Sequence, residues 1–66
     1  MTETLKGREV IFELRPVGNI MRVSAMDTES GTEIVIQCPV SAGEAAFKKN
    51  ALMRLEFTLR KKGIIQ

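Results

Sequence analysis

The chain has 66 residues, of which 44% are hydrophobic and 27% charged, and its 10 basic and 8 acidic side chains give a net charge of +2. This length supports a single domain over 1–66, and the composition is typical of a globular protein and not of a disordered one. There is no histidine and one cysteine, which excludes histidine-based triads, histidine zinc sites and an intramolecular disulfide. We therefore expect no enzymatic activity, no cofactor and no metal site.

No stretch has the length or apolar character of a signal peptide or a membrane-spanning helix. Together with the single cysteine, this predicts a protein of the reducing cytoplasm with no membrane partner. A domain of this size buries only about 60% of its unfolded surface, so self-association is expected to stabilise it.

The first predicted strand covers residues 8–15. Val10, Phe12 and Leu14 recur there at every second position between charged residues, which is typical of a half-buried strand. Residues 1–7 contain no comparable pattern and are expected to be flexible.

Two further strands are predicted at 19–27 and 32–38, the second rich in β-branched residues. The segment from Pro16 to Asn19 predicts the first turn, and the polar residues 28–31, which end in glycine, predict the second. Pro39 ends the third strand.

The two turns predict registers that place the apolar residues on one face of the sheet. Across the first turn the predicted pairs are Arg15 with Ile20, Leu14 with Met21, Phe12 with Val23 and Val10 with Ala25. Across the second turn they are Asp27 with Thr32, Ala25 with Ile34, Val23 with Ile36 and Met21 with Cys38. On the other face, these registers place Glu13 beside Arg22 and Arg22 beside Gln37.

One long helix is predicted over 42–62. Ser41 and Glu44 have the spacing of a capping box, and Gly63 stands where a C-terminal cap is expected. Residues 64–66 are expected to be flexible, so that the ordered part is about 8–62.

The predicted fold is therefore α+β, with a three-stranded antiparallel meander followed by a helix on its apolar face. The helical residues expected to cover the sheet are Ala45, Ala51, Leu52, Leu55 and Leu59, with Phe47 at the edge. The short connection before the helix leaves open whether the helix covers its own sheet or that of a second copy.

Some apolar side chains are predicted to lie outside this core. On the helix they form a second ridge, and on the outer sheet face Ile11, Ser24 and Val35 are expected to form a row across the strands. The candidate partner surface consists of Ala46, Met53, Phe57, Ile11 and Val35. We expect this surface to make the protein a homodimeric interaction module, since a second copy related by twofold symmetry would cover it.

The alternative is a nucleic-acid-binding module. Residues 48–62 hold six basic residues and one acidic residue, whereas residues 1–47 hold four basic and seven acidic residues. The candidate phosphate contacts are Lys48, Lys49, Arg54, Arg60, Lys61 and Lys62. The competing interpretation is that these cations complement the negative C-terminus of the helix and keep the protein soluble.

The cysteine and the strand carboxylates are not expected to form a reactive site. Cys38 is expected to face the core beside Met21 as an inert thiol. Glu9 and Glu13 share the outer sheet face and are expected to be solvated, because no apolar enclosure accompanies them.

The chain resembles a family of short uncharacterised bacterial proteins over about residues 9–60. The segments that carry the resemblance are Val10-Ile11-Phe12-Glu13, Gly18-Asn19, Val23-Ser24-Ala25-Met26-Asp27, Gly31-Thr32-Glu33, Gly43-Glu44-Ala45-Ala46, Ala51-Leu52 and Leu55-Glu56. The resemblance implies a bacterial cytoplasmic setting and no assigned activity.

The order of strands and helix is also similar to the second half of the double-stranded RNA-binding domain. In that family a basic cluster at the start of the last helix contacts phosphates, and a preceding helix contacts the minor groove. Here the helix opens with Ser41-Ala42-Gly43-Glu44, Lys48 and Lys49 come later, and no preceding helix is predicted.

Overall fold

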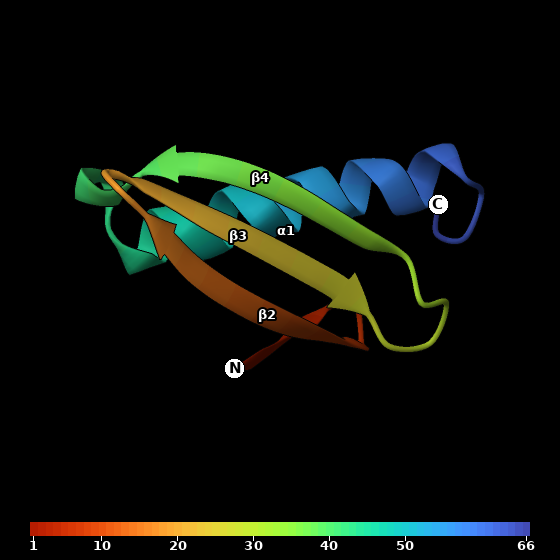
Figure 1. The fold of residues 1–66 in the computed structure, drawn as a ribbon. Coiled ribbons are helices and arrows are strands. Elements are labelled where there is room, and N and C mark those ends of the chain that lie inside the picture. The colour runs from red at the N-terminus through yellow and green to blue at the C-terminus, as the bar shows by residue number, and fades with distance from the viewer.

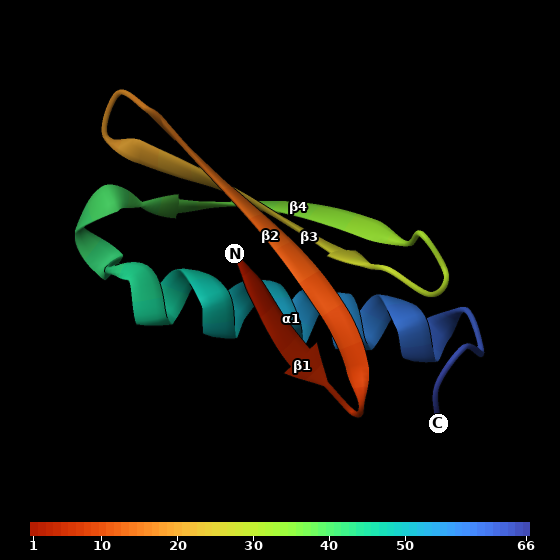
Figure 2. The same ribbon diagram turned by 90° about the horizontal axis from the view of Figure 1, so that it is seen from below.

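An antiparallel sheet forms one layer of the protein and one long helix forms the other (Figures 1 and 2). The computed structural model describes residues 1–66. The elements are β1 (Thr2–Leu5), β2 (Arg8–Val17), β3 (Ile20–Asp27), β4 (Glu33–Pro39), the 3-10 turn η1 (Val40–Ala42) and α1 (Glu44–Lys61). The α+β class is confirmed, but the predicted meander of three strands is wrong, because the sheet has four strands in the order β1-β2-β3-β4.

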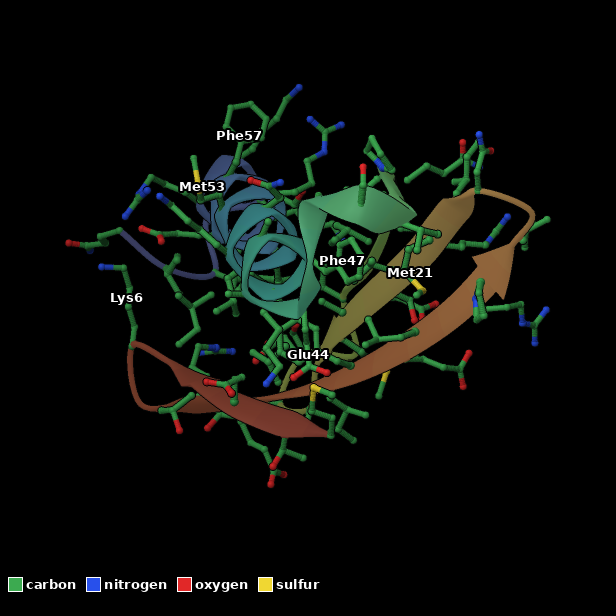
Figure 3. The ribbon with its side chains drawn as sticks, turned by 90° about the vertical axis from the view of Figure 1, so that its left-hand side faces the viewer. Lys6, Met21, Glu44, Phe47, Met53 and Phe57 are labelled. Atoms are coloured by element: carbon green, nitrogen blue, oxygen red, sulfur yellow. The ribbon has the colours of Figure 1, made fainter.

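β1 occupies most of the segment 1–7, for which no strand is predicted. It pairs with β2 from Thr2 to Leu5. Lys6 and Gly7 join the two strands in a two-residue turn and have positive φ angles of 51° and 77°. Positive φ angles at both turn residues give the turn the same right-handed twist as the strands that it joins. The sheet curves around the helix, so that β1 lies beside α1 (Figures 2 and 3).

The predicted register of the hairpin between β2 and β3 is wrong by two residues. Val17 and not Arg15 lies opposite Ile20, because the turn contains only Gly18 and Asn19. Gly18 has a φ of 61°, which a glycine at the first turn position adopts without strain. The observed pairs are Leu14 with Val23, Phe12 with Ala25, Val10 with Asp27, Glu13 with Ser24 and Arg15 with Arg22. Since the shift is an even number of residues, every side chain stays on its predicted face.

The predicted register of the second hairpin is confirmed. Ala25 lies opposite Ile34, and the same register places Met21 opposite Cys38. Arg22 lies opposite Gln37, as predicted, but Glu13 is not its neighbour on β2.

The start of the helix differs from the prediction. α1 begins at Glu44 with Gly43 as its N-cap, and no side chain caps it, so the predicted capping box is wrong. Ser41 instead lies within η1, outside the helix. The predicted cap at the other end is confirmed, because Gly63 has a φ of 78° and its N–H donates to the Arg60 carbonyl oxygen at 3.0 Å.

The core lies between α1 and the inner face of its own sheet. Its buried apolar residues are Val10, Phe12, Val23, Ala25, Ile34, Cys38, Phe47, Ala51, Leu55 and Leu59. One prediction for the helix needs correction, since Ala45 is exposed. Leu52 is half-buried and packs against this core, as predicted. Ile64 and Ile65, in the segment expected to be flexible, pack against this core. No helix combines the length and apolar character that crossing a membrane requires.

Candidate functional site

The outer face of α1 carries the helical part of the predicted partner surface. Met53 and Phe57 are 60% and 55% exposed, and both point away from the sheet (Figure 3). Ala46, two turns before Met53, is half-buried. Leu55 lies in the core, on the opposite side of the helix, as a rotation of about 100° per residue requires. The exposed ridge of α1 therefore consists of Met53 and Phe57.

Two cations lie over the ring of Phe57. The Arg54 Cζ atom is 5.8 Å from the ring centroid, and the Lys61 Nζ atom is 6.0 Å from it. Arg54 precedes Phe57 by three residues and Lys61 follows it by four, so the two side chains share its side of the helix. The most exposed aromatic side chain of the protein is thus surrounded by positive charge.

The structure divides the six predicted phosphate contacts into two groups. Lys48 forms ion pairs with Glu3 (3.4 Å) and Glu44 (3.7 Å), and Arg60 forms one with Glu56 (2.8 Å). The cations without an ion pair within 4.0 Å are Lys49, Arg54, Lys61 and Lys62. The six side chains therefore do not form one uniform phosphate-binding surface.

Two of the ion pairs connect the first hairpin with α1, one from β1 and one from the turn that follows it. Lys48 reaches Glu3, and Lys6 reaches Glu56 at 3.8 Å. The pattern of the sequence could not show the first pair, because 45 positions separate the two residues. Both pairs are partly exposed, so each is expected to stabilise the fold by about 1 kcal/mol at most.

The outer face of the sheet, opposite the helix, carries the rest of the predicted partner surface. Ile11 and Val35 are both exposed there. They do not form the predicted row with Ser24, because Ile11 lies opposite Met26 and only Val35 lies opposite Ser24. The candidate partner residues thus lie on two opposite faces of the protein. An open hollow on the outer sheet face is lined by Glu13, Arg15, Arg22, Ser24, Glu33 and Val35.

The edge of β4 is open along its whole length. The Asp27 N–H donates to the Thr32 carbonyl oxygen (2.8 Å) and the Val40 N–H to the Asn19 carbonyl oxygen (3.0 Å). Since backbone groups alternate in direction along a strand, the even-numbered residues of β4 bond to β3. The groups that point away from β3 are those of Glu33, Val35 and Gln37.

The opposite edge of the sheet is less open. β1 is only four residues long, and it leaves the far end of β2 unpaired. Pro16 lies in that part of β2 and has no N–H to donate, which is a common way of protecting an edge. The open edge of β4 is therefore the better template for a further strand.

A buried ionic cluster joins the start of β2 to the turn between β3 and β4. The Asp27 side chain is fully buried, and Arg8 donates to it from Nε (3.1 Å) and Nη2 (2.9 Å). Ser30 donates to Asp27 Oδ2 from its hydroxyl (2.6 Å) and its backbone N–H (3.1 Å). A further ion pair links Arg8 to the exposed Glu29 at 3.0 Å.

This cluster holds the Asp27 carboxylate in its charged form. The hydrogen bond from Arg8 is the main reason why the pKa of Asp27 falls from 3.8 to about 2, and the hydrogen bonds from Ser30 act in the same direction against burial. A carboxylate that accepts bonds at both oxygens and stays ionised is a poor proton acceptor. We therefore assign the cluster to fold stability and not to catalysis.

The lowered pKa of Asp27 predicts a loss of stability in acid. Because the folded-state pKa lies below the unfolded value of 3.8, the stabilisation is complete above about pH 5 and disappears as the pH falls towards 2. The loss in unfolding free energy should be on the order of 2 kcal/mol. Urea unfolding from pH 6 to pH 2 measures it. The double variant Arg8→Met with Asp27→Asn, which has neither the titrating carboxylate nor an unpaired charge, should lack this component of the pH dependence.

The other reactive residue types lie apart from one another. Cys38 is buried, as predicted, and Glu9 and Glu13 are exposed on the sheet. The protein contains no group of three or more His, Cys, Asp and Glu side chains close enough to hold a metal ion.

Comparison with protein families assigns most of the chain to a domain of unknown function. Residues 7–62 match the family model DUF6898, a match that includes β2, β3, β4 and α1 but not β1. No curated protein and no solved structure matches the chain. The predicted membership in an uncharacterised family is confirmed: the chain belongs to the DUF6898 family, a domain of unknown function.

Proposed function

We propose that the protein is a non-enzymatic interaction module that forms a homodimer through the open edge of β4. The observation that carries the proposal is the position of this edge relative to the exposed ridge of α1. β4 is the uppermost strand of the sheet in Figure 1, and Met53 and Phe57 lie uppermost in Figure 3, which is turned about the vertical axis. Unpaired backbone groups and exposed apolar side chains thus occur on the same side of the protein.

Antiparallel pairing of β4 with its copy would satisfy these backbone groups. A twofold axis at Ile36 would place Val35 opposite the partner subunit's Gln37, with reciprocal N–H to carbonyl hydrogen bonds. The axis would be perpendicular to the sheet, so the two sheets would become one sheet with both helices on the same face. Strands about 4.8 Å apart would bring the two helices, each packed on β3 and β4, close to the usual helix-packing distance.

The size of the protein makes such pairing favourable. Only 12 of 66 residues are buried in the single chain, and the exposed apolar residues include Met53 and Phe57. Full burial of one such side chain is worth about 1.5 to 3 kcal/mol. Ile11 lies on the outer sheet face and is not part of the proposed interface, whereas Val35 takes part through its backbone.

A Val35→Pro substitution tests the proposal. Proline removes the N–H that points to the open edge, and proline is tolerated in edge strands, so the single chain should still fold. We expect the dimer dissociation constant to rise about 10- to 100-fold, because each copy loses the hydrogen bond that the N–H of residue 35 donates across the interface. Sedimentation equilibrium from micromolar to millimolar concentration measures this, with circular dichroism to check the fold.

Val35→Thr is the matched control, since it keeps the β-branched shape and the N–H. It should dimerise as the parent does. A parent chain that stays monomeric at every concentration would refute the homodimer, and an unweakened Val35→Pro dimer would refute its geometry. Phe57→Asp should weaken the dimer without unfolding the chain, because the side chain is exposed.

Nucleic-acid binding is the second candidate function. It is favoured by the four cations of residues 48–62 that have no carboxylate partner, of which Arg54 and Lys61 adjoin Phe57.

We also propose that the protein is located in the cytoplasm. Its one cysteine, Cys38, is a buried free thiol, as is usual for proteins of a reducing compartment. A bacterial origin stays a prediction.

A further inference from the structure

We propose that Arg54, Phe57 and Lys61 form a binding site for single-stranded nucleic acid, in which one base stacks on the Phe57 ring and the two cations contact the flanking phosphates. This inference rests on the second candidate function and adds the class of ligand and the residues that bind it. The site needs only one chain. A dimer paired through β4 would cover the ridge of α1 that includes Phe57, so a second copy and the single strand would compete for this surface.

The position of the ring suits stacking. Phe57 lies on the outermost ridge of the protein, is 55% exposed and points away from the sheet (Figure 3). Met53, one turn earlier, provides an apolar neighbour. A base can therefore approach the ring without any movement of the backbone.

The position of the cations suits phosphate binding. With a rise of 1.5 Å per residue, Arg54 and Lys61 stand about 4.5 and 6 Å from Phe57 along the helix axis, in opposite directions. A strand that runs along the helix with one base on the ring would thus meet a positive charge on each side of that base. Single strands are bound in this way by a combination of stacking and electrostatic attraction.

Both cations are free to make these contacts. Neither Arg54 nor Lys61 has a carboxylate within 4.0 Å, and the single acidic residue of 48–62, Glu56, is paired with Arg60 and Lys6. Their present contacts with the ring are 5.8 and 6.0 Å long, at the outer limit of a cation–π interaction. An exposed contact of this kind is worth about 0.5 to 1 kcal/mol, less than the 1 to 3 kcal/mol of base stacking. A base can therefore replace the cations at the ring and leave them for the phosphates.

The small apolar area favours a single strand over other anionic partners. One ring with one methionine can cover one base, whereas a stable protein interface buries about 800 Å² on each partner. Duplex nucleic acid keeps its base faces stacked inside the helix, so it would use the two cations but not the ring. A single strand uses all three residues.

Fluorescence anisotropy of the full chain with a labelled 15-nucleotide oligothymidylate tests the site. Affinity should fall about 7-fold between 50 and 200 mM salt if the two cations neutralise two phosphates. Phe57→Leu, which keeps the charge and most of the apolar bulk, should weaken binding about 5- to 100-fold. Arg54→Gln and Lys61→Gln should each weaken binding and lower the salt slope by about 0.7.

Ile11→Val, on the opposite face of the protein, is the matched control and should bind as the parent does, with circular dichroism confirming that every variant is folded. A duplex of the same length should bind more weakly and should not respond to Phe57→Leu. Equal binding of the duplex, or an unchanged affinity of Phe57→Leu, would refute the single-strand site while leaving general phosphate binding in place. No binding of either oligonucleotide at 50 mM salt would refute the site together with the second candidate function. Displacement of the oligonucleotide by an equal charge concentration of polyglutamate would assign the surface to an acidic protein and would also refute the site.

Discussion

The Asp27→Asn variant is expected to lose about 3 to 5 kcal/mol of unfolding free energy. Removal of one partner from a buried ion pair usually costs this much, because the remaining charge has no compensation. Arg8 would keep only the exposed Glu29 as a partner. A chain of 66 residues is expected to be stable by only about 3 to 10 kcal/mol, so the variant should be largely unfolded or close to it. Urea unfolding near pH 7 measures the loss.

Two further variants separate the buried pair from general charge effects. Glu29→Gln removes the exposed partner of Arg8 and should cost less than about 1 kcal/mol. The double variant Arg8→Met with Asp27→Asn should be more stable than the sum of the two single losses predicts, since it leaves no unpaired charge. If Asp27→Asn cost no more than Glu29→Gln, the cluster would have no special role in the fold.

The two hairpins show why one register can be predicted from the sequence and the other cannot. The polar residues 28–31 occupy the second turn and leave one way of joining the strands. At the first turn, the strands can end at Arg15 and Ile20 or at Val17 and Ile20. Both arrangements keep the apolar residues on the same face, because they differ by two residues. Pro16 looks like a turn residue, and only the sheet order shows that it lies at an unpaired edge.

The burial of Asp27 follows from the same register. At the end of a strand, an aspartate is usually a turn residue in contact with water. Here the longer hairpin places it opposite Val10 on the inner face, where Arg8 can reach it. No local pattern indicates this contact, since 19 positions separate the two residues. β1 was equally hard to predict, because its only signal is the turn formed by Lys6 and Gly7.

The helical surface could be predicted better than its electrostatics. A rotation of about 100° per residue is enough to place Met53 and Phe57 opposite the core. The partners of Lys48 and Arg60 depend on β1 and on Glu56, so the number of free cations could be known only from the structure. The open edge of β4 likewise depends on the strand order, which hydrophobic periodicity does not fix.

The Leu55→Ala variant is expected to lose about 3 to 5 kcal/mol of unfolding free energy, whereas Met53→Ala should lose less than about 0.5 kcal/mol. The two residues are only two positions apart, but Leu55 is fully buried against the sheet and Met53 is 60% exposed. The loss for Leu55→Ala is the sum of two free energies, the transfer free energy of the removed side-chain atoms and the cost of the cavity that remains. In a domain of this size it corresponds to a fall in the melting temperature of about 12 to 40 °C.

Thermal unfolding of both variants at low micromolar concentration, where little dimer should form, compares their losses of stability in the single chain. At higher concentration the dimer stabilises the folded parent chain, because a partner that binds only the folded state raises its stability. The loss in melting temperature caused by Met53→Ala should therefore be larger there, since the proposed dimer covers the ridge of α1. A large loss for Met53→Ala at every concentration would mean that this side of the helix is buried within the single chain. Equal effects of the two variants would contradict the packing of α1 on its own sheet through Leu55, and with it the exposed surface on which both proposals depend.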